Sequence, residues 1–338
     1  MDLRLPLATS DITGLQFHSY FLSVILNSKK NYNFVYNNYI QLLVRYKNHS
    51  HVDFMFESLL SSGDLPIHKI NIKGIVDNIK DLIINTLTKG FYLVINVNEC
   101  YLPHRRAYNS YYRRHDIMIY GINTERNTCY TCGYDEFGHY SEIEHNISDI
   151  ETAYYHLESD WDFEHCIFKM DESVQYNLDL EKINRDIIEY LYHTNSYNKL
   201  IDDFYINGSI KEHILNISSI NCYGIMVYDF LCDEINNHLK KASSIDLRSY
   251  QLLYEHKCII MKLITTLNSE GHIQYNPKNY TMIVNLAQQI KIMLLKYLST
   301  ANTQICNNIL ARLVELKERE KKELTNVQKL LSNNINNM

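Results

Sequence analysis

The sequence predicts an α+β fold, with a small antiparallel sheet and its helices in residues 1–175 and an all-helical domain in residues 176–338. Two observations predict this division. Short apolar runs with strand character are concentrated in the first part, whereas beyond about residue 176 apolar residues recur at helical spacing in one long segment after another. With 46% hydrophobic and 21% charged residues, a chain of 338 residues can bury one large core or two medium ones.

The first part combines helices with strands. Residues 17–26 form an apolar helix candidate, which Asp11 or Thr13 can cap. Apolar residues at three- and four-residue steps predict a second helix over 75–87, ending at Gly90. The expected strands, of which the second and third form a hairpin, are 91–97, 116–122, 128–134 and 166–170.

The second part reads as a succession of helices. They are expected over 180–193, 220–241, 246–268, 279–299 and 302–331. The last of them contains the charge run 315–323, through which an apolar stripe continues. We interpret this run as the solvated face of a long helix, and a dedicated binding tail is the alternative.

Composition and motifs exclude several function classes. The formal net charge of −6 and the lack of a long basic block disfavour nucleic-acid binding through phosphate neutralisation. No glycine-rich phosphate loop or dinucleotide motif occurs among the 10 glycines. No apolar run is long enough to cross a membrane, and residues 1–6 lack the features of a secretory signal. We therefore expect a soluble, cytoplasmic protein with no membrane contact.

One hairpin offers a pair of groups suited to catalysis. His115 stands at the start of one expected strand, and Asp135 follows the next, so antiparallel pairing predicts that they lie at the same level. A carboxylate there would fix the imidazole tautomer, as the base of a nucleophilic site requires. Glu136 and Asp116 are alternative carboxylates, and strand alternation favours Asp135 over Glu136.

A nucleophile is expected at the start of the first helix, where backbone N–H groups favour negative charge. The residues there are Gln16 to Tyr20, and no cysteine occurs in the first 99 residues. Ser19 is the candidate nucleophile, and its alternative role is a helix cap. His18 is a second candidate for the site base, although neighbouring helical residues point about 100° apart.

These features resemble those of a known family, the N-terminal domain of butirosin biosynthesis protein H. The resemblance rests on His18–Ser19 in the early helix, on the strand running into residues 99–103, and on His115 leading a strand that ends in Tyr120–Gly121. It covers most of residues 10–140, and the rest only in general character. It implies a papain-like fold for residues 1–175, with Ser19 as nucleophile, His115 as general base and Asp135 as orienting acid.

The resemblance also implies an activity in specialised metabolism such as peptide or polyketide antibiotic biosynthesis. Typical members move an acyl group from the phosphopantetheine thioester of a carrier protein to an amine through a cysteine. Ser19 replaces that cysteine, and a hydroxyl cannot be pre-ionised as a thiol can. The open readings are an acyltransferase using Ser19, His115 and Asp135, direct aminolysis with His115 as base, a proofreading thioesterase, and a degenerate module that only binds.

The expected partners are an acyl or peptidyl carrier protein and a small-molecule amine acceptor, with no cofactor beyond the carrier's phosphopantetheine. A homodimer through the helical domain stays open. The candidate substrate or carrier contacts are His18, Gln16, Tyr101, Arg105 and Arg113. The arginines belong to a basic patch of His104, Arg105, Arg106, Arg113 and Arg114, which is either solvated loop charge or a docking site for an acidic or phosphate-bearing partner.

Cys129 and Cys132 form a C-x-x-C pair. No second pair with partner spacing exists, and residues three apart on a strand point to opposite faces. We therefore interpret the pair as a coincidence of the hairpin rather than as a metal or redox site, and predict no metal centre.

Overall fold

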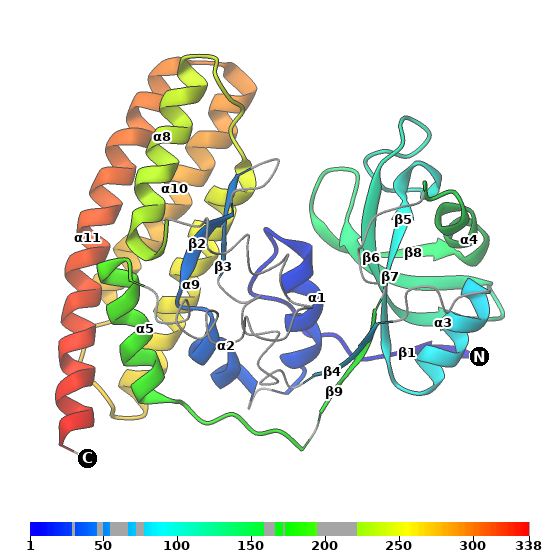
Figure 1. Ribbon diagram of the computed structural model, residues 1–338, viewed down its shortest axis with the longest axis horizontal. Helices are drawn as coiled ribbons and strands as arrows, with labels where there is room; N and C mark the ends of the chain where they lie inside the picture. The colour runs from blue at the N-terminus through cyan, green and yellow to red at the C-terminus, as the bar shows by residue number, and fades with distance from the viewer. Residues whose placement is uncertain are drawn as a thin grey trace, which may run out of the picture. The chain divides into compact units, whose positions relative to one another are not determined.

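The computed structural model describes residues 1–28, 31–45, 50–54, 67–71, 78–158, 166–171, 173–194 and 222–337 (Figure 1). The chain forms two compact units. The first comprises Met1–Asn31 and Leu65–Gln175, and the second comprises Tyr32–Asp64 and Tyr176–Met338. The mixed α+β class with a helical C-terminal part is confirmed. A domain covering all of residues 1–175 is wrong, because residues 32–64 belong with the helical unit.

The first unit is built on an antiparallel sheet of seven strands. Its order is β4-β9-β5-β6-β7-β8, and β1 pairs with the end of β6 beyond the reach of β5. The strands are β1 (Asp2–Arg4), β4 (Ile67–Asn71), β5 (Tyr92–Asn98), β6 (Arg114–Asn123), β7 (Thr128–Tyr134), β8 (Tyr140–Asn146) and β9 (Cys166–Met170). All seven residues of β5 are buried, as expected for a central strand covered on both faces.

Helices cover both faces of this sheet (Figure 1). α3 (Ile79–Thr88) and α4 (Ile147–Tyr155) pack on one face, where Ile83 and Ile150 join the core formed by β5 and β6. α1 (Gln16–Ile25) packs on the other face, with the rings of Phe21 and Phe168 4.8 Å apart. Ile167 packs against the core under α3 and α4, whereas its neighbour Phe168 packs against α1. Successive residues of β9 therefore point to opposite faces of the sheet.

In the residues that the structure describes, the second unit is helical apart from one hairpin. Its described elements are α2 (Tyr32–Asn38), β2 (Leu42–Arg45), β3 (His51–Phe54), α5 (Leu180–Tyr192), the 3₁₀ turn η5 (Gly224–Met226), α8 (Val227–Leu239), α9 (Leu247–Ser269), α10 (Lys278–Thr300) and α11 (Thr303–Asn336). The Val52 N–H donates to the Ser249 hydroxyl at 3.0 Å, and Leu43 forms a β-bridge with Tyr223. These contacts explain why the hairpin belongs to this unit.

A fully buried polar network joins the helices of the second unit. Lys257 of α9 pairs with Glu320 of α11 at 2.8 Å, and both side chains are 0% exposed. Three tyrosine hydroxyls, from Tyr190, Tyr228 and Tyr280, also donate to this carboxylate at 2.6–2.9 Å. Burial opposes ionisation of Glu320, but the charge of Lys257 and the hydrogen bonds from Lys257 and Tyr228 act together in the other direction, and the pKa of that carboxyl is lowered. Five helices therefore converge on a single carboxylate.

The network continues to the segment before the hairpin. Lys257 Nζ donates to His256 Nδ1 at 2.9 Å, and His256 Nε2 donates to the Ile40 carbonyl at 2.8 Å. Burial and the neighbouring Lys257 lower the pKa of His256 to about 3, so the ring is neutral. The proton on Nε2 leaves Nδ1 as the acceptor that Lys257 needs.

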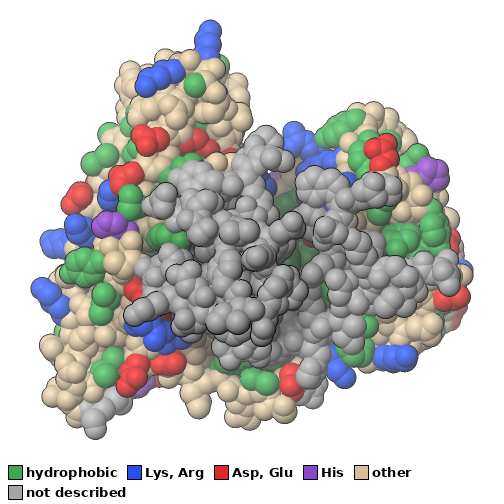
Figure 2. Space-filling view, in the orientation of Figure 1, with side chains coloured by type: hydrophobic (Ala, Val, Ile, Leu, Met, Phe, Trp, Pro, Cys, Tyr) green, Lys and Arg blue, Asp and Glu red, His purple; other side chains and the backbone are tan. Residues whose placement is uncertain are grey.

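The charged residues of the run 315–323 lie on the outer side of α11, apart from Glu320, which is buried as Leu316 is. Figure 2 shows positive and negative side chains interspersed over the surface that it colours. Arg319 pairs with Glu315 at 2.8 Å within this run. The arrangement agrees with the solvated-face interpretation. None of the described helices has both the length and the apolar character needed to cross a bilayer.

Glu234 of α8 gives this unit a pH-dependent stability. It is buried, one oxygen accepts the Asp246 N–H at 3.0 Å, and the other has no hydrogen-bond partner among the described residues. Burial raises its pKa to about 7. Because its pKa is raised, Glu234 holds its proton more tightly in the folded state than in the unfolded state. The resulting contribution to the free energy of unfolding is fully present below about pH 4.5 and is lost as pH rises through 7.

We expect Glu234→Gln to raise the free energy of unfolding at pH 8 by up to about 3 kcal/mol, because the amide needs no proton to be neutral. At pH 4 the variant and the parent should be equally stable within about 0.5 kcal/mol. Urea unfolding at both pH values measures this difference. Glu318→Gln, at an exposed position of α11, is the control. Equal effects of the two substitutions would contradict the assignment of the pH dependence to Glu234.

Candidate functional site

The hairpin of β6 and β7 opens at the end where the catalytic pair was expected. The last paired residues are Met118 and Cys132, and continuing this register would bring Asp135 opposite His115. Instead, the side chain of Gln16 enters between the strands. Its Nε2 donates to the Asp116 carbonyl at 2.8 Å, and its Oε1 accepts the Tyr134 N–H at 3.2 Å. A side-chain amide thus replaces the missing rung of the ladder.

The orientation of Gln16 fixes the tautomer of His115. Its Nε2 lies 2.6 Å from His115 Nδ1, and the two backbone partners require this atom to be the donor. In the neutral ring, Nδ1 is therefore the acceptor and Nε2 carries the proton. The lone pair that a general base would use is occupied by Gln16. In this arrangement His115 presents a hydrogen-bond donor.

Glu99 is the carboxylate group that the sequence analysis missed. Its Oε1 lies 3.7 Å from His115 Nδ1, its side chain is 1% exposed, and Arg113 Nη1 lies 3.2 Å from its other oxygen. The pairing of Val97 with His115 brings the end of β5 to this point. The sequence contained a signal for Glu99. This residue directly follows one expected strand, and that strand can lie antiparallel to the strand that begins at His115.

Ser19 lies away from this cluster of polar groups. Its hydroxyl is 0% exposed and donates to the Ile12 carbonyl at 2.7 Å, with the Leu15 carbonyl at 3.4 Å. No hydrogen bond joins it to His115 among the described contacts. The expected nucleophile is therefore an anchor for the helix start, as a buried hydroxyl needs an acceptor and the carbonyl before the helix supplies one.

Asp135 also serves a local turn. Its Oδ1 accepts the N–H groups of Phe137 and His139 at 2.9 and 2.8 Å, and its Oδ2 accepts the Ser141 hydroxyl at 3.1 Å. Burial is the largest single influence and would raise the pKa of the carboxyl, but these three bonds together outweigh it and lower that pKa. Asp135 closes the turn between β7 and β8 and does not orient His115. The structure does not assemble the expected Ser19–His115–Asp135 triad.

The expected contact residues have separate positions. His18 is 1% exposed inside α1, and Arg113 is engaged by Glu99. Arg105 is 2% exposed, so it is no surface docking residue, and its Nη1 donates to the Tyr134 carbonyl at 2.7 Å. A Cβ at position 133 would stand 2.4 Å from this atom, which explains why Gly133 occupies the position. Tyr101 is 37% exposed.

The two cysteines of the C-x-x-C pair lie on opposite faces of β7. Cys129 joins the core under α3 and α4, while Cys132 faces α1 and lies near Tyr140. Both thiols are free and buried, and burial raises the pKa of each to about 12. Neither thiol ionises readily at neutral pH. Within the ranges given above, the structure shows no group of three or more side chains arranged to hold a metal ion.

Residues 99–112, which begin with the 3₁₀ turn η3 (Glu99–Tyr101), connect β5 to β6 and present an aromatic surface. Leu102 and Ala107 are buried beneath it, and the Asn109 N–H donates to the Cys100 carbonyl at 3.0 Å. Above these anchors, four tyrosines are 37–50% exposed and Arg106 is exposed beside them. We call this the tyrosine surface, and its members are Tyr101, Tyr108, Tyr111, Tyr112 and Arg106.

Comparison with protein-family models and with curated proteins finds no match to this chain.

Proposed function

We propose that this protein is a binding module, related to the butirosin family and its papain-like fold, that has lost catalytic capacity and recognises a carrier protein or a biosynthetic intermediate. The buried bond from the Ser19 hydroxyl to the Ile12 carbonyl carries this proposal. A hydroxyl held in that way has no adjacent base to accept its proton. The occupied Nδ1 of His115 supports the same conclusion and argues against direct aminolysis.

The tyrosine surface is the proposed docking site. Tyrosine side chains supply large contact areas at low entropic cost, and they are common in protein interfaces. Arg106 adds a cation that can pair with an acidic side chain or with the phosphate of phosphopantetheine. An acidic carrier protein bearing this group offers both. The chemistry of the surface thus fits the partner that the resemblance implies.

The absence of turnover is tested with a model acyl thioester, such as an acyl-N-acetylcysteamine, in the presence of an amine. We expect neither amide nor free acid above the uncatalysed rate, and no labelling of Ser19 by a fluorophosphonate. Amide formation that disappears in His115→Ala would contradict the proposal and restore a base role for that residue. Free acid formation that disappears in Ser19→Ala would instead indicate a thioesterase.

Binding is tested with an acidic acyl carrier protein in its holo form. We expect Arg106→Glu to weaken binding at least tenfold in a calorimetric titration, because the substitution reverses the charge of the exposed cation in the tyrosine surface. Lys321→Glu on the exposed side of α11 makes the same charge change and should have no effect. If both substitutions weaken binding equally, the docking site lies elsewhere. If the holo carrier does not bind at all, the carrier proposal is wrong.

A further inference from the structure

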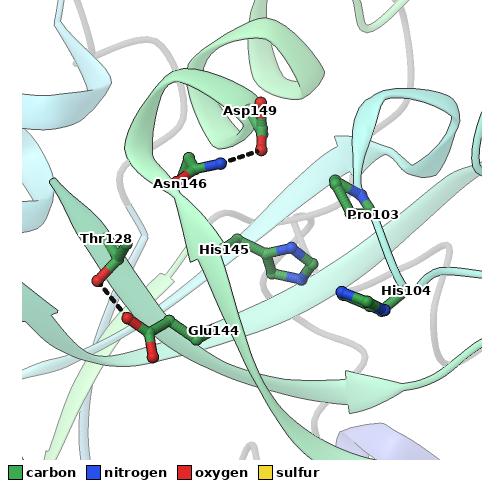
Figure 3. Close-up of a pocket in the computed structure, with 7 residues that line it drawn as sticks. All are labelled: Pro103, His104, Thr128, Glu144, His145, Asn146 and Asp149. Atoms are coloured by element: carbon green, nitrogen blue, oxygen red, sulfur yellow. Dashed lines mark hydrogen bonds between the residues drawn. The ribbon is translucent and has the colours of Figure 1, made fainter. Parts of the chain in front are cut away.

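A cavity of about 420 Å³ lies beside β8 and the start of α4, and the proposed function does not use it. Its lining residues are Pro103, His104, Thr128, Glu144, His145, Asn146 and Asp149. Figure 3 shows the imidazole of His145 in the middle of this group, directed toward Pro103 and His104. The volume falls within the range of small-molecule sites.

His145 is the unusual member of the lining. Its side chain is 2% exposed, and neither ring nitrogen has a hydrogen-bond partner among the described residues. A buried polar group without a partner has lost its hydrogen bonds to water with nothing in return, so native chains rarely keep one without a reason. Burial, followed by the charge of Arg105, lowers the pKa of His145 to about 3. The ring is neutral and offers one donor and one acceptor.

The surroundings of His145 favour an anionic group on a ligand. The guanidinium of Arg105 is close enough to act on the ring electrostatically, and two of its nitrogens, Nε and Nη2, have no hydrogen-bond partner among the described residues. α4 begins directly after Asn146, and the N-terminus of a helix attracts negative charge.

Two carboxylates lie at other edges of the same cavity. Asp149 accepts the Asn146 side-chain N–H at 2.9 Å, and Glu144 accepts the Thr128 hydroxyl at 2.6 Å, as Figure 3 shows. Arg126 lies 3.3 Å from Glu144. A simple anion would meet these two carboxylates as like charges. A ligand that carries both an anionic and a cationic group satisfies the whole lining.

We propose that this cavity binds a small zwitterion of the α-amino acid class, whose carboxylate accepts the N–H of His145 and whose ammonium group lies toward Asp149. The ligand carboxylate satisfies the imidazole within the positive field of Arg105 and the start of α4. Both ring nitrogens of His145 are shielded from solvent, and Figure 3 places His104 beside the ring. The exposed His104 side chain therefore moves aside when the ligand enters.

Nuclear magnetic resonance of the imidazole ¹⁵N nuclei in the full chain tests this proposal, with L-alanine, acetate, ethylammonium and inorganic phosphate as separate probes. We expect L-alanine to shift the His145 nitrogens, and to bind at least tenfold more tightly than acetate or ethylammonium. The exposed His139 ring should not respond. His145→Phe, which keeps a ring of similar size, identifies the signals and should abolish the response.

Asp149→Asn tests the second end of the ligand. The variant keeps the oxygen that accepts the Asn146 N–H, so the start of α4 is preserved. We expect this substitution to weaken the binding of L-alanine at least tenfold. The binding of acetate should be unchanged or slightly tighter. Phosphate or acetate binding as tightly as L-alanine would overturn the zwitterion assignment. No shift of the His145 nitrogens with any probe at about 10 mM, which corresponds to a binding free energy of only about −2.7 kcal/mol, would overturn the site itself.

Discussion

Lys257→Met is expected to lower the free energy of unfolding by about 3–5 kcal/mol, because it leaves the buried Glu320 carboxylate without its cation. The three tyrosine hydroxyls still donate to Glu320, but they carry no charge. Urea unfolding followed by the helical circular dichroism signal measures the loss. Lys296→Met, on the exposed side of α10, should change stability by less than about 0.5 kcal/mol.

A double variant separates lost charge pairing from lost packing. In Lys257→Met with Glu320→Gln, no charge is left buried, and the amide oxygen can still accept from the tyrosines. We expect the double variant to lose less unfolding free energy than the two single variants lose in sum, by at least about 1 kcal/mol. Additive effects, or a Lys257→Met protein as stable as the parent, would show that the ion pair is not what holds these helices together.

Gly224→Ala is the second substitution with a large expected effect. Gly224 has a φ of +53°, and a Cβ there would lie 2.3 Å from the carbonyl oxygen and 2.8 Å from the Cα of Tyr190. The left-handed backbone disfavours alanine by about 1–2 kcal/mol, and the overlap with the backbone of α5 adds about 1–3 kcal/mol. We expect a total loss of about 2–5 kcal/mol in urea unfolding.

Gly271→Ala is the matched control for this prediction. Gly271 also has a positive φ, +78°, but nothing lies within 4 Å of a Cβ built there. Its substitution should show the backbone effect alone, about 1–2 kcal/mol. Two equal losses would mean that the close approach of η5 to α5 is relaxed without strain, and that the contact with Tyr190 adds nothing to stability.

Local patterns predicted most of the regular elements. The strands β5, β6, β7 and β9 and the helices α1, α5, α9, α10 and α11 lie within a few residues of their expected bounds, because each has a clear apolar period or a clear end signal. The helix expected over 220–241 starts at Val227, after the turn η5, and its first two residues lie outside the described residues. The start of the helix expected over 75–87 is likewise outside them at residues 75–77, and α3 begins at Ile79.

Several elements were missed, namely β1, α2, β2, β3, β4, β8 and α4. Most of these are short, and β8 has a largely exposed pattern that carries little apolar signal. The spacing of apolar residues along a segment also gives no information about the unit against which that segment packs. The hairpin of β2 and β3 belongs with α9 through contacts such as that between Val52 and Ser249, about two hundred positions apart.

The candidate site failed for a similar reason. The hairpin argument placed Asp135 near the level of His115. The pairing of Met118 with Cys132 points toward that pair only because a bulge between Ile119 and Gly121 shifts the register by one residue, and the pair itself does not form. The strands separate before that point, because a side chain from α1, Gln16, bonds to both of them. No local pattern encodes such an insertion. Strand pairing also brings Glu99 to His115, but from β5, which lies outside the hairpin and pairs with β6 on its other side.

The path of the chain has a practical consequence for dissecting this protein. It passes from the first unit to the second after Asn31, returns at Leu65, and passes over again after Gln175. No single cut therefore releases either unit whole. A fragment starting at residue 176 would lack Ile40, whose carbonyl accepts from His256, and would leave that buried imidazole without its backbone partner. Proteolysis at one bond should yield nicked, associated pieces rather than two free halves.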